Sequence, residues 1–245
     1  LLREGEYTIE DNSEGEKTII RNAVICYSGG DDLFIVGAWN EIIELAIDIQ
    51  KKFALYTEGT LTLSAGIGIY RHNYPISVIA EEVADMESMS KSKAGKAAVT
   101  LLEDGVKHKE LGQDGYYMYI SDGTFGWNEL VDEVIGEKYN CIREFFDDTG
   151  ERGINFLYNL LELIRNQDDR INFARIVYIL SRLEPDKVAE KEEKEHYSRF
   201  SQNIYIWVKD GDKDIRQLKV AMNMYSYMRR DKYNTEESGG SDDAD

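Results

Sequence analysis

The sequence predicts an α+β protein in which a sheet-containing domain comes first and a helical domain follows. Residues 18–123 alternate apolar runs of strand length with two amphipathic helical patterns, whereas residues 124–232 show helical spacing almost throughout. With 245 residues, the chain is long enough for two domains that each bury a core. Two polar ends frame these domains. Residues 1–17 are expected to be a loop or linker from a preceding region, and residues 233–245 a disordered acidic tail.

The first domain is organised around a predicted hairpin. Its strands are the apolar runs Thr18–Tyr27 and Leu33–Gly37, and its turn is Ser28-Gly29-Gly30-Asp31-Asp32. A short apolar run bounded by turn residues is typical of a strand buried on both faces, and two glycines allow a tight turn. We therefore expect a buried hairpin that presents two adjacent carboxylates at its tip.

The elements after the hairpin are predicted from their periodicity. They are a helix over about Asn40–Tyr56, an alternating strand Thr60–Tyr70, a helix from Pro75 to about Ala94 that Gly95 ends, and strands Ala97–Leu102 and Tyr116–Ile120 separated by a charged loop. Gly66 and Gly68 share one face of the alternating strand, which suggests that a helix or a ligand packs closely there. This order is most of a ferredoxin-like βαββαβ unit, which is also the palm of nucleotide polymerases and cyclases.

The second domain is predicted to be a small α-helical bundle. Apolar residues recur at helical spacing in five segments joined by short links, over residues 127–146, 154–164, 173–180, 188–208 and 215–228.

Composition limits the classes of function. The net charge of −18 argues against a protein that grips nucleic acid across its own surface, so a polyanion would be met locally, through metal ions or basic partner subunits. The two cysteines, Cys26 and Cys141, are far apart in sequence and indicate neither a disulfide framework nor a zinc site. We expect a cytoplasmic setting and no membrane contact, because no apolar run approaches the roughly 18 residues of a membrane span. The start at Leu1 within a polar stretch suggests a fragment.

The hairpin tip carries the residues that nucleotidyl transfer needs. Two Mg²⁺ or Mn²⁺ ions bridged by carboxylates can activate a hydroxyl and neutralise a triphosphate, and Asp31 and Asp32 are the candidate catalytic residues and metal ligands. The remaining candidates are expected to contact ATP: Gly29 and Gly30 by allowing close approach, Ser28 through its hydroxyl, and Lys91 and Lys96 as cations near the triphosphate.

Each candidate has a simpler interpretation. Gly and Asp are ordinary turn formers, so the tip can be a turn and nothing more. Cations are favoured at a helix C-terminus by the macrodipole, which alone would explain Lys91. Ser28 can simply cap the turn. The context of a hairpin, a helix, a glycine-bearing strand and a lysine-rich helix end favours the nucleotide site.

With these motifs in hand, the chain resembles the large subunit of type III CRISPR effector complexes of subtype III-A, the cyclic-oligoadenylate synthetase. The matching segments are the hairpin Tyr27–Gly37, the strand Leu63–Ile67, the helix end from Ala84 to Lys96, and Gly126-Trp127 at the entry to the helical domain. Together they cover about residues 18 to 230. The resemblance implies a second palm domain followed by the C-terminal helical domain.

The resemblance also implies an activity and partners. ATP would be joined into cyclic oligoadenylates, an antiviral messenger, when the guide RNA pairs with target RNA. The metal ligands would be Asp31 and Asp32, with a third acid from a first palm strand that the chain lacks. The family's single-stranded DNA nuclease would lie in a missing N-terminal domain. Partners would be the guide and target RNA, the other type III subunits, especially the small subunit on the helical domain, and the remainder of the protein's own chain.

Two alternatives remain open from the sequence. The diguanylate cyclases share the Gly-Gly-Asp turn, but their signature continues with Glu-Phe where Asp32 and Leu33 stand here, and the helical domain is foreign to them. In the second alternative, the palm is mainly a scaffold and the bundle docks the small subunits and RNA of a ribonucleoprotein.

Overall fold

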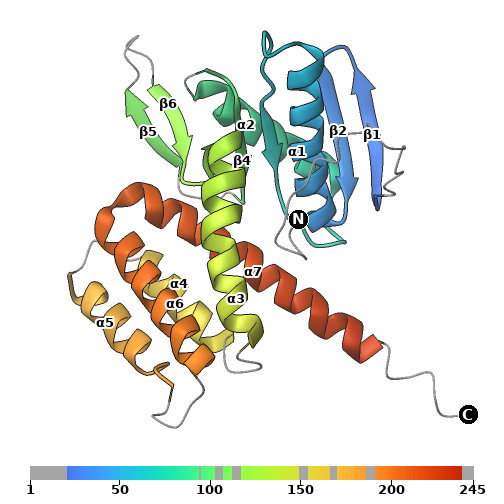
Figure 1. Ribbon diagram of the computed structural model, residues 1–245. Coiled ribbons are helices and arrows are strands. Elements are labelled where there is room, and N and C mark those ends of the chain that lie inside the picture. The colour runs from blue at the N-terminus through green and yellow to red at the C-terminus, as the bar shows by residue number, and fades with distance from the viewer. Residues whose placement is uncertain are drawn as a thin grey trace, which may run out of the picture. The chain divides into compact units, whose positions relative to one another are not determined.

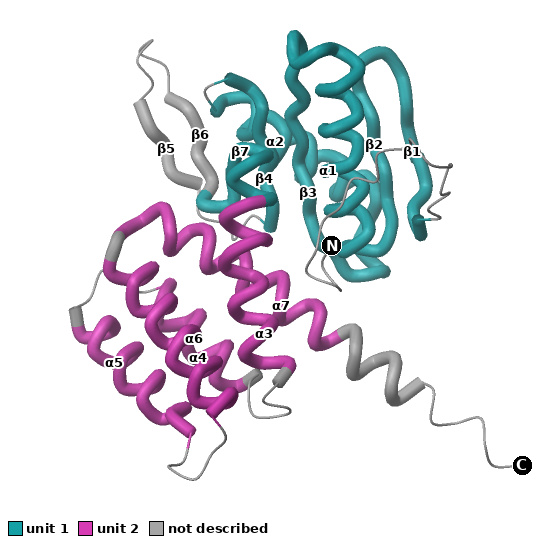
Figure 2. Tube along the Cα trace, in the orientation of Figure 1, with its two compact units in different colours: residues 1–131 teal, residues 132–245 magenta. Residues whose placement is uncertain are grey.

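The protein is described by a computed structural model that covers residues 21–93, 95–102, 107–111, 117–148, 154–165, 170–185 and 191–238. It divides into two compact units, residues 1–131 and residues 132–245 (Figure 2). The first unit mixes strands and helices and the second is helical, which confirms the α+β class. The predicted linker over residues 1–17 lies outside the described residues.

In its described residues, the first unit contains three small sheets and two long helices (Figure 1). Its elements are β1 Ala23–Gly29, β2 Asp32–Gly37, α1 Trp39–Tyr56, β3 Ala65–Ile67, α2 Ile76–Ser92, β4 Ala98–Leu101, β5 Lys107–Leu111, β6 Tyr117–Ser121 and β7 Thr124–Gly126. β1 and β2 form one hairpin and β5 and β6 another, while β4 pairs parallel with β3 and antiparallel with β7. The ferredoxin-like sheet stays a prediction, because the described strands do not join into one sheet.

A chain of buried hydroxyl groups fixes α2 on the β3–β4–β7 sheet. The Ser90 hydroxyl donates to the Ala65 carbonyl of β3 at 2.7 Å and lies 2.7 Å from the Thr100 hydroxyl of β4. Thr100 in turn lies 2.9 Å from the Thr124 hydroxyl of β7. Because a buried hydroxyl without a partner is costly, this chain sets the position of the last turn of α2 against all three strands.

Two predictions about strands were wrong. The strand Thr60–Tyr70 is reduced to β3, and just before it the Leu63 carbonyl is bonded to a side chain instead of a neighbouring strand. The Leu63 carbonyl accepts a bond from Trp127 Nε1 at 2.8 Å, and the Ser64 hydroxyl donates to the Lys96 carbonyl at 2.5 Å. The charged loop after β4 contains β5, which pairs with β6, and the pattern also missed β7.

Gly66 of β3 lies where α2 packs on the strand, as its position in the alternating pattern predicted. A Cβ atom on Gly66 would lie 2.4 Å from the Val83 carbonyl oxygen and 2.7 Å from the Glu87 backbone nitrogen of α2. Both neighbours are backbone atoms of a helix, so neither can turn aside as a side chain would.

Gly66→Ala is therefore expected to lower the free energy of unfolding by about 1 to 3 kcal/mol, the usual cost of forcing an extra carbon into a packed core. Urea unfolding measures the change. Gly126→Ala in β7 is the matched control, because its Cβ would meet nothing closer than 4.0 Å. Equal losses for the two variants would contradict the close approach of α2 to β3.

The β1–β2 hairpin forms as predicted, but its burial on both faces was predicted wrongly. Val24 is 67% exposed, Ile25 63% and Leu33 47%. The two strands pair with each other and with no further strand among the described residues. Arg21, just before β1, bonds Glu44 and Asp48 of α1, at 2.6 Å in each case, and ties the hairpin to that helix. The apolar composition of a strand therefore does not by itself show that other elements cover both of its faces.

The second unit is helical and its helices correspond to the predicted segments. They are η2 Glu129–Tyr139, a π-helix that begins in the first unit, and α3 Asn140–Asp148, α4 Ile154–Arg165, α5 Arg170–Ser181, α6 Lys191–Asp210 and α7 Asp212–Ser238. α7 covers the first part of the stretch 233–245 that was expected to be disordered, and residues 239–245 lie outside the described residues. The bundle arrangement stays a prediction.

Aromatic rings join three helices of this unit. Phe145 of α3 stacks on Phe200 of α6 with ring centroids 4.1 Å apart, and Phe146 lies 5.8 Å from Tyr225 of α7. All four rings are buried, so they form part of the core of the unit. In the part of the chain that the structure describes, no helix is both long and apolar enough to span a membrane.

Candidate nucleotide and metal site

The candidate site begins at the turn of the β1–β2 hairpin. Gly29 pairs with Asp32 across the strands, so Gly30 and Asp31 form a two-residue loop. Gly30 has φ of +64°, in the left-handed region that favours glycine, and Asp31 is not among the residues with positive φ. This φ pattern matches a type II′ turn, which suits the twist of a hairpin. A side chain at the first loop position would be strained, which explains why glycine stands there.

Asp31 and Asp32 occupy different parts of the hairpin. Asp31 belongs to the loop and Asp32 begins β2, and both are exposed at the tip. Since Asp31 stands outside the regular strand, the alternation that directs neighbouring strand side chains to opposite faces does not apply to it. Ser28 pairs with Leu33 and is also exposed. The turn thus presents two carboxylates together with Gly30, where an added Cβ atom would meet no atom of the described residues within 4 Å.

Lys91 is the lysine that the structure brings near these acids. It lies in the last turn of α2, and its Nζ pairs with Glu87 Oε1 at 2.8 Å. The pKa of Lys91 is raised, first by the hydrogen bond and charge of Glu87 and further by the charges of Asp32 and Asp31. The charges of both hairpin acids thus act on Lys91, although its ion-pair partner is Glu87.

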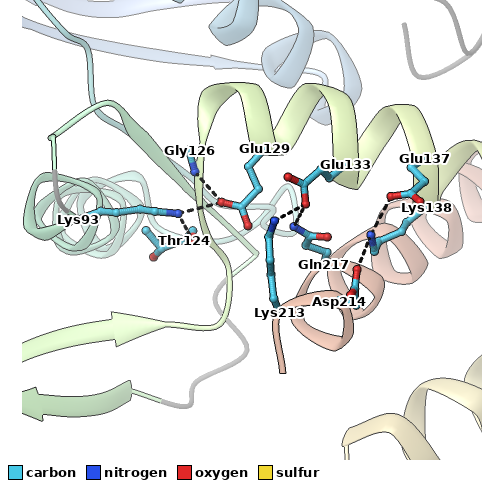
Figure 3. A network of polar contacts seen from close by, with 10 residues as sticks. All are labelled: Lys93, Thr124, Gly126, Glu129, Glu133, Glu137, Lys138, Lys213, Asp214 and Gln217. Atoms are coloured by element: carbon cyan, nitrogen blue, oxygen red, sulfur yellow. Dashed lines mark hydrogen bonds and ion pairs between the residues drawn. The ribbon is translucent and has the colours of Figure 1, made fainter. Parts of the chain in front are cut away.

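Lys93 has a structural role (Figure 3). Its Nζ lies 2.9 Å from Glu129 Oε2 and 3.5 Å from the Thr124 carbonyl, while Glu129 also accepts a bond from the Gly126 backbone nitrogen. The Lys96 backbone, at φ of +52°, is held by the bond from Ser64, and its side chain is exposed. The segment from Lys93 to Lys96 is thus held in place at both ends. Among the described residues, no contact links Lys96 to Asp31 or Asp32.

The donors at the tip suit a hard divalent cation only in part. Carboxylate oxygens are ligands that Mg²⁺ prefers, and Mg²⁺ is commonly held by one or two carboxylates together with substrate phosphates and water. Among the described residues, no group of three or more His, Cys, Asp or Glu side chains gathers as a metal site. Asp31 and Asp32 would therefore hold an ion together with ligands that the described residues do not supply.

Sequence reasoning missed two residues that shape this site. Glu87 stands four residues before Lys91, a spacing that alone predicts a helical ion pair. Glu129 holds Lys93 across 36 residues of sequence, and no local pattern signals that contact.

Two segments of the chain match models of known protein families. Residues 8–100 match the second palm domain of Cas10/Cmr2, and residues 143–231 match the second helical domain of the Cmr2 subunit of the CRISPR RNA silencing complex. A match to a palm domain is thus followed along the chain by a match to a helical domain of the same kind of subunit. The chain belongs to the Cas10/Cmr2 family, and the resemblance to type III-A large subunits seen in the sequence is confirmed.

Most of the chain aligns with individual proteins of this family. It is 41% identical over 210 residues to the Cas10/Csm1 single-strand-specific deoxyribonuclease, subtype III-A, of Mycobacterium tuberculosis, covering 86% of this chain and 23% of that protein. The corresponding Streptococcus thermophilus protein is 32% identical over 210 residues, covering 84% and 25%. The chain thus spans about a quarter of the length of these curated relatives. A crystal structure of the Csm1–Csm4 cassette in complex with cA4 has a similar fold, with a TM-score of 0.53 and 24% identity over 84% of this chain and 27% of that one.

Proposed function

We propose that this chain is the nucleotidyltransferase part of a type III CRISPR interference complex, which converts ATP into cyclic oligoadenylate when target RNA binds. The observation that carries the proposal is the hairpin turn, which presents Asp31 and Asp32 at an open glycine and close enough to Lys91 for their charges to raise its pKa. Carboxylates for divalent metal ions and a fixed cation for phosphate are the two requirements of metal-assisted nucleotidyl transfer.

The positions of the chain's own residues support the roles that we assign to them. The Gly29-Gly30 backbone allows a triphosphate to approach, Asp31 and Asp32 hold the divalent ions, and Lys91 attracts the phosphate charge. When bound, Mg²⁺ or Mn²⁺ would lower the pKa of the attacking hydroxyl and neutralise charge on the triphosphate. Ser28 and Lys96 stay candidates for contacts to the nucleotide, both exposed in the same unit.

Family membership supports the setting of this chemistry. We place the chain in an assembly with guide RNA, target RNA and the other type III subunits, with the small subunit on the helical domain. The chain's strong net negative charge fits RNA being held mainly by partners. We do not assign the deoxyribonuclease activity in the relatives' names to these residues. It would belong to an N-terminal domain of the family.

A direct assay tests the proposal. The assembly, purified through a tag on this protein, is expected to make cyclic oligoadenylates from ATP with Mg²⁺ or Mn²⁺ only when matching target RNA is present. Chromatography with mass spectrometry identifies the product. Controls without metal or with mismatched RNA should give none. Consumption of GTP in preference to ATP would contradict the adenylate assignment, and an inactive but intact assembly would favour the scaffold interpretation.

A further inference from the structure

The β1 strand contains an irregularity that changes which residues share a face with Asp32. Ala23, Val24 and Ile25 pair in register with Gly37, Val36 and Ile35, but the next pair is Tyr27 with Phe34. Cys26 is therefore an extra residue, a β-bulge. In the register before the bulge, Tyr27 would stand opposite Leu33 and face away from Asp32. After the bulge Tyr27 pairs with Phe34 and Gly29 with Asp32, so Tyr27 and Asp32 share one face.

The Tyr27 ring extends along this face toward the turn. A Cβ atom built on Gly29 would lie 2.6 Å from the Tyr27 hydroxyl oxygen and 3.0 Å from the ring carbon that bears it. The ring thus lies directly against Gly29, whose strand partner is Asp32. Tyr27 is nevertheless 57% exposed. An open aromatic surface thus lies against Gly29, on the face of the hairpin that carries Asp32.

We propose that Tyr27 packs against the purine base of the ATP whose triphosphate is held at Asp31, Asp32 and Lys91. The inference rests on the proposed function and adds the residue that binds the other end of the nucleotide. Every base offers a flat face, and an aromatic side chain beside a phosphate-binding group is the usual way to hold it. Bulges recur next to active sites, where they redirect a side chain, and this one turns Tyr27 onto the face of Asp32.

The test separates the base from the phosphates. Tyr27→Leu keeps an apolar side chain but removes the flat ring, so in the purified assembly the KM for ATP should rise about tenfold, the loss expected from one base–aromatic contact, while kcat at saturating ATP stays within about twofold. A non-hydrolysable ATP analogue should bind about tenfold more weakly. Inorganic tripolyphosphate, which has no base, should compete equally well against both proteins. Tyr27→Phe should behave like the unmodified protein.

Tyr56→Leu is the matched control, because Tyr56 is 88% exposed at the end of α1, and it should leave every value unchanged. If Tyr27→Leu does not assemble, Tyr27→Thr, a residue that favours strands, replaces it. Unchanged affinity for the ATP analogue, or equal weakening of the analogue and tripolyphosphate, would overturn the inference. An unmodified assembly that neither binds ATP nor makes product would instead overturn the proposed function.

Discussion

Replacing Asp31 and Asp32 together by alanine is expected to reduce oligoadenylate synthesis by roughly a thousandfold or more, which corresponds to about 4 kcal/mol of transition-state stabilisation. The two carboxylates are the exposed acids of the hairpin turn, and no described side chain completes a metal site that could replace them. Because the metal ions that we propose these acids hold would neutralise charge that develops in the transition state, their loss should lower kcat.

The measurement compares product formed by the Asp31→Ala, Asp32→Ala double variant with that of the unmodified assembly at saturating ATP and Mg²⁺. Both substitutions lie in an exposed turn, so the assembly should purify with unchanged composition. Glu192→Ala with Glu193→Ala is the matched control, since these adjacent acids begin α6 in the other unit. A double hairpin variant that still makes product would show that the metal ligands are assigned wrongly.

The second large effect concerns the buried Lys138 of the helical unit. Its side chain is 1% exposed, its Nζ lies 2.9 Å from Asp214 Oδ1 and 3.1 Å from Glu137 Oε2 (Figure 3), and it stands 5.0 Å from the centre of the Trp207 ring. Burying an ammonium group is costly unless it is paired and hydrogen-bonded. The ion pair with Asp214 joins η2 to the first turn of α7.

Asp214→Ala is therefore expected to lower the free energy of unfolding by about 3 kcal/mol, because it leaves the buried ammonium group with the half-exposed Glu137 as its one acidic partner among the described residues. Lys138→Met should cost no more than about 1 kcal/mol, since it replaces the charge by an apolar chain of similar length and leaves Asp214 partly hydrated. Denaturant unfolding measures both values.

The exposed ion pair of Lys191 and Glu195 in α6 provides the control. Lys191 is 91% exposed, and Lys191→Met should change stability by less than about 0.5 kcal/mol. Equal losses for Asp214→Ala and Lys138→Met would show that the ion pair as such, and not the uncompensated buried charge, determines stability at this position.

Local patterns in the sequence were enough for the hairpin, for α1 and α2, and for the tip of the candidate site. The Gly29-Gly30 turn, α1 and α2 depend on interactions between residues a few positions apart, and such interactions are visible in the sequence. The same holds for the position of Lys91 at the end of α2, because helix periodicity and Gly95 together predict where that helix stops.

Contacts between distant segments could not be predicted in this way. Lys91 and Lys93 read alike in the sequence, yet Lys93 is held by Glu129 while Lys91 stands near the hairpin acids. Just before β3, the Leu63 carbonyl and the Ser64 hydroxyl bond to Trp127 and to the Lys96 backbone, which other segments bring there. The separation of a structural lysine from a candidate phosphate-binding lysine thus depends on which partners folding brings together.

The hairpin shows both levels in one element. By itself the sequence determined that two strands meet at a glycine turn bearing Asp31 and Asp32, because turn chemistry is local. The tertiary structure decided the exposure of the strands and the face on which Tyr27 lies. Exposure depends on which other elements pack against a strand. The bulge at Cys26 shifts the register by one residue and so moves side chains to the other face, although the pattern of residue types does not change.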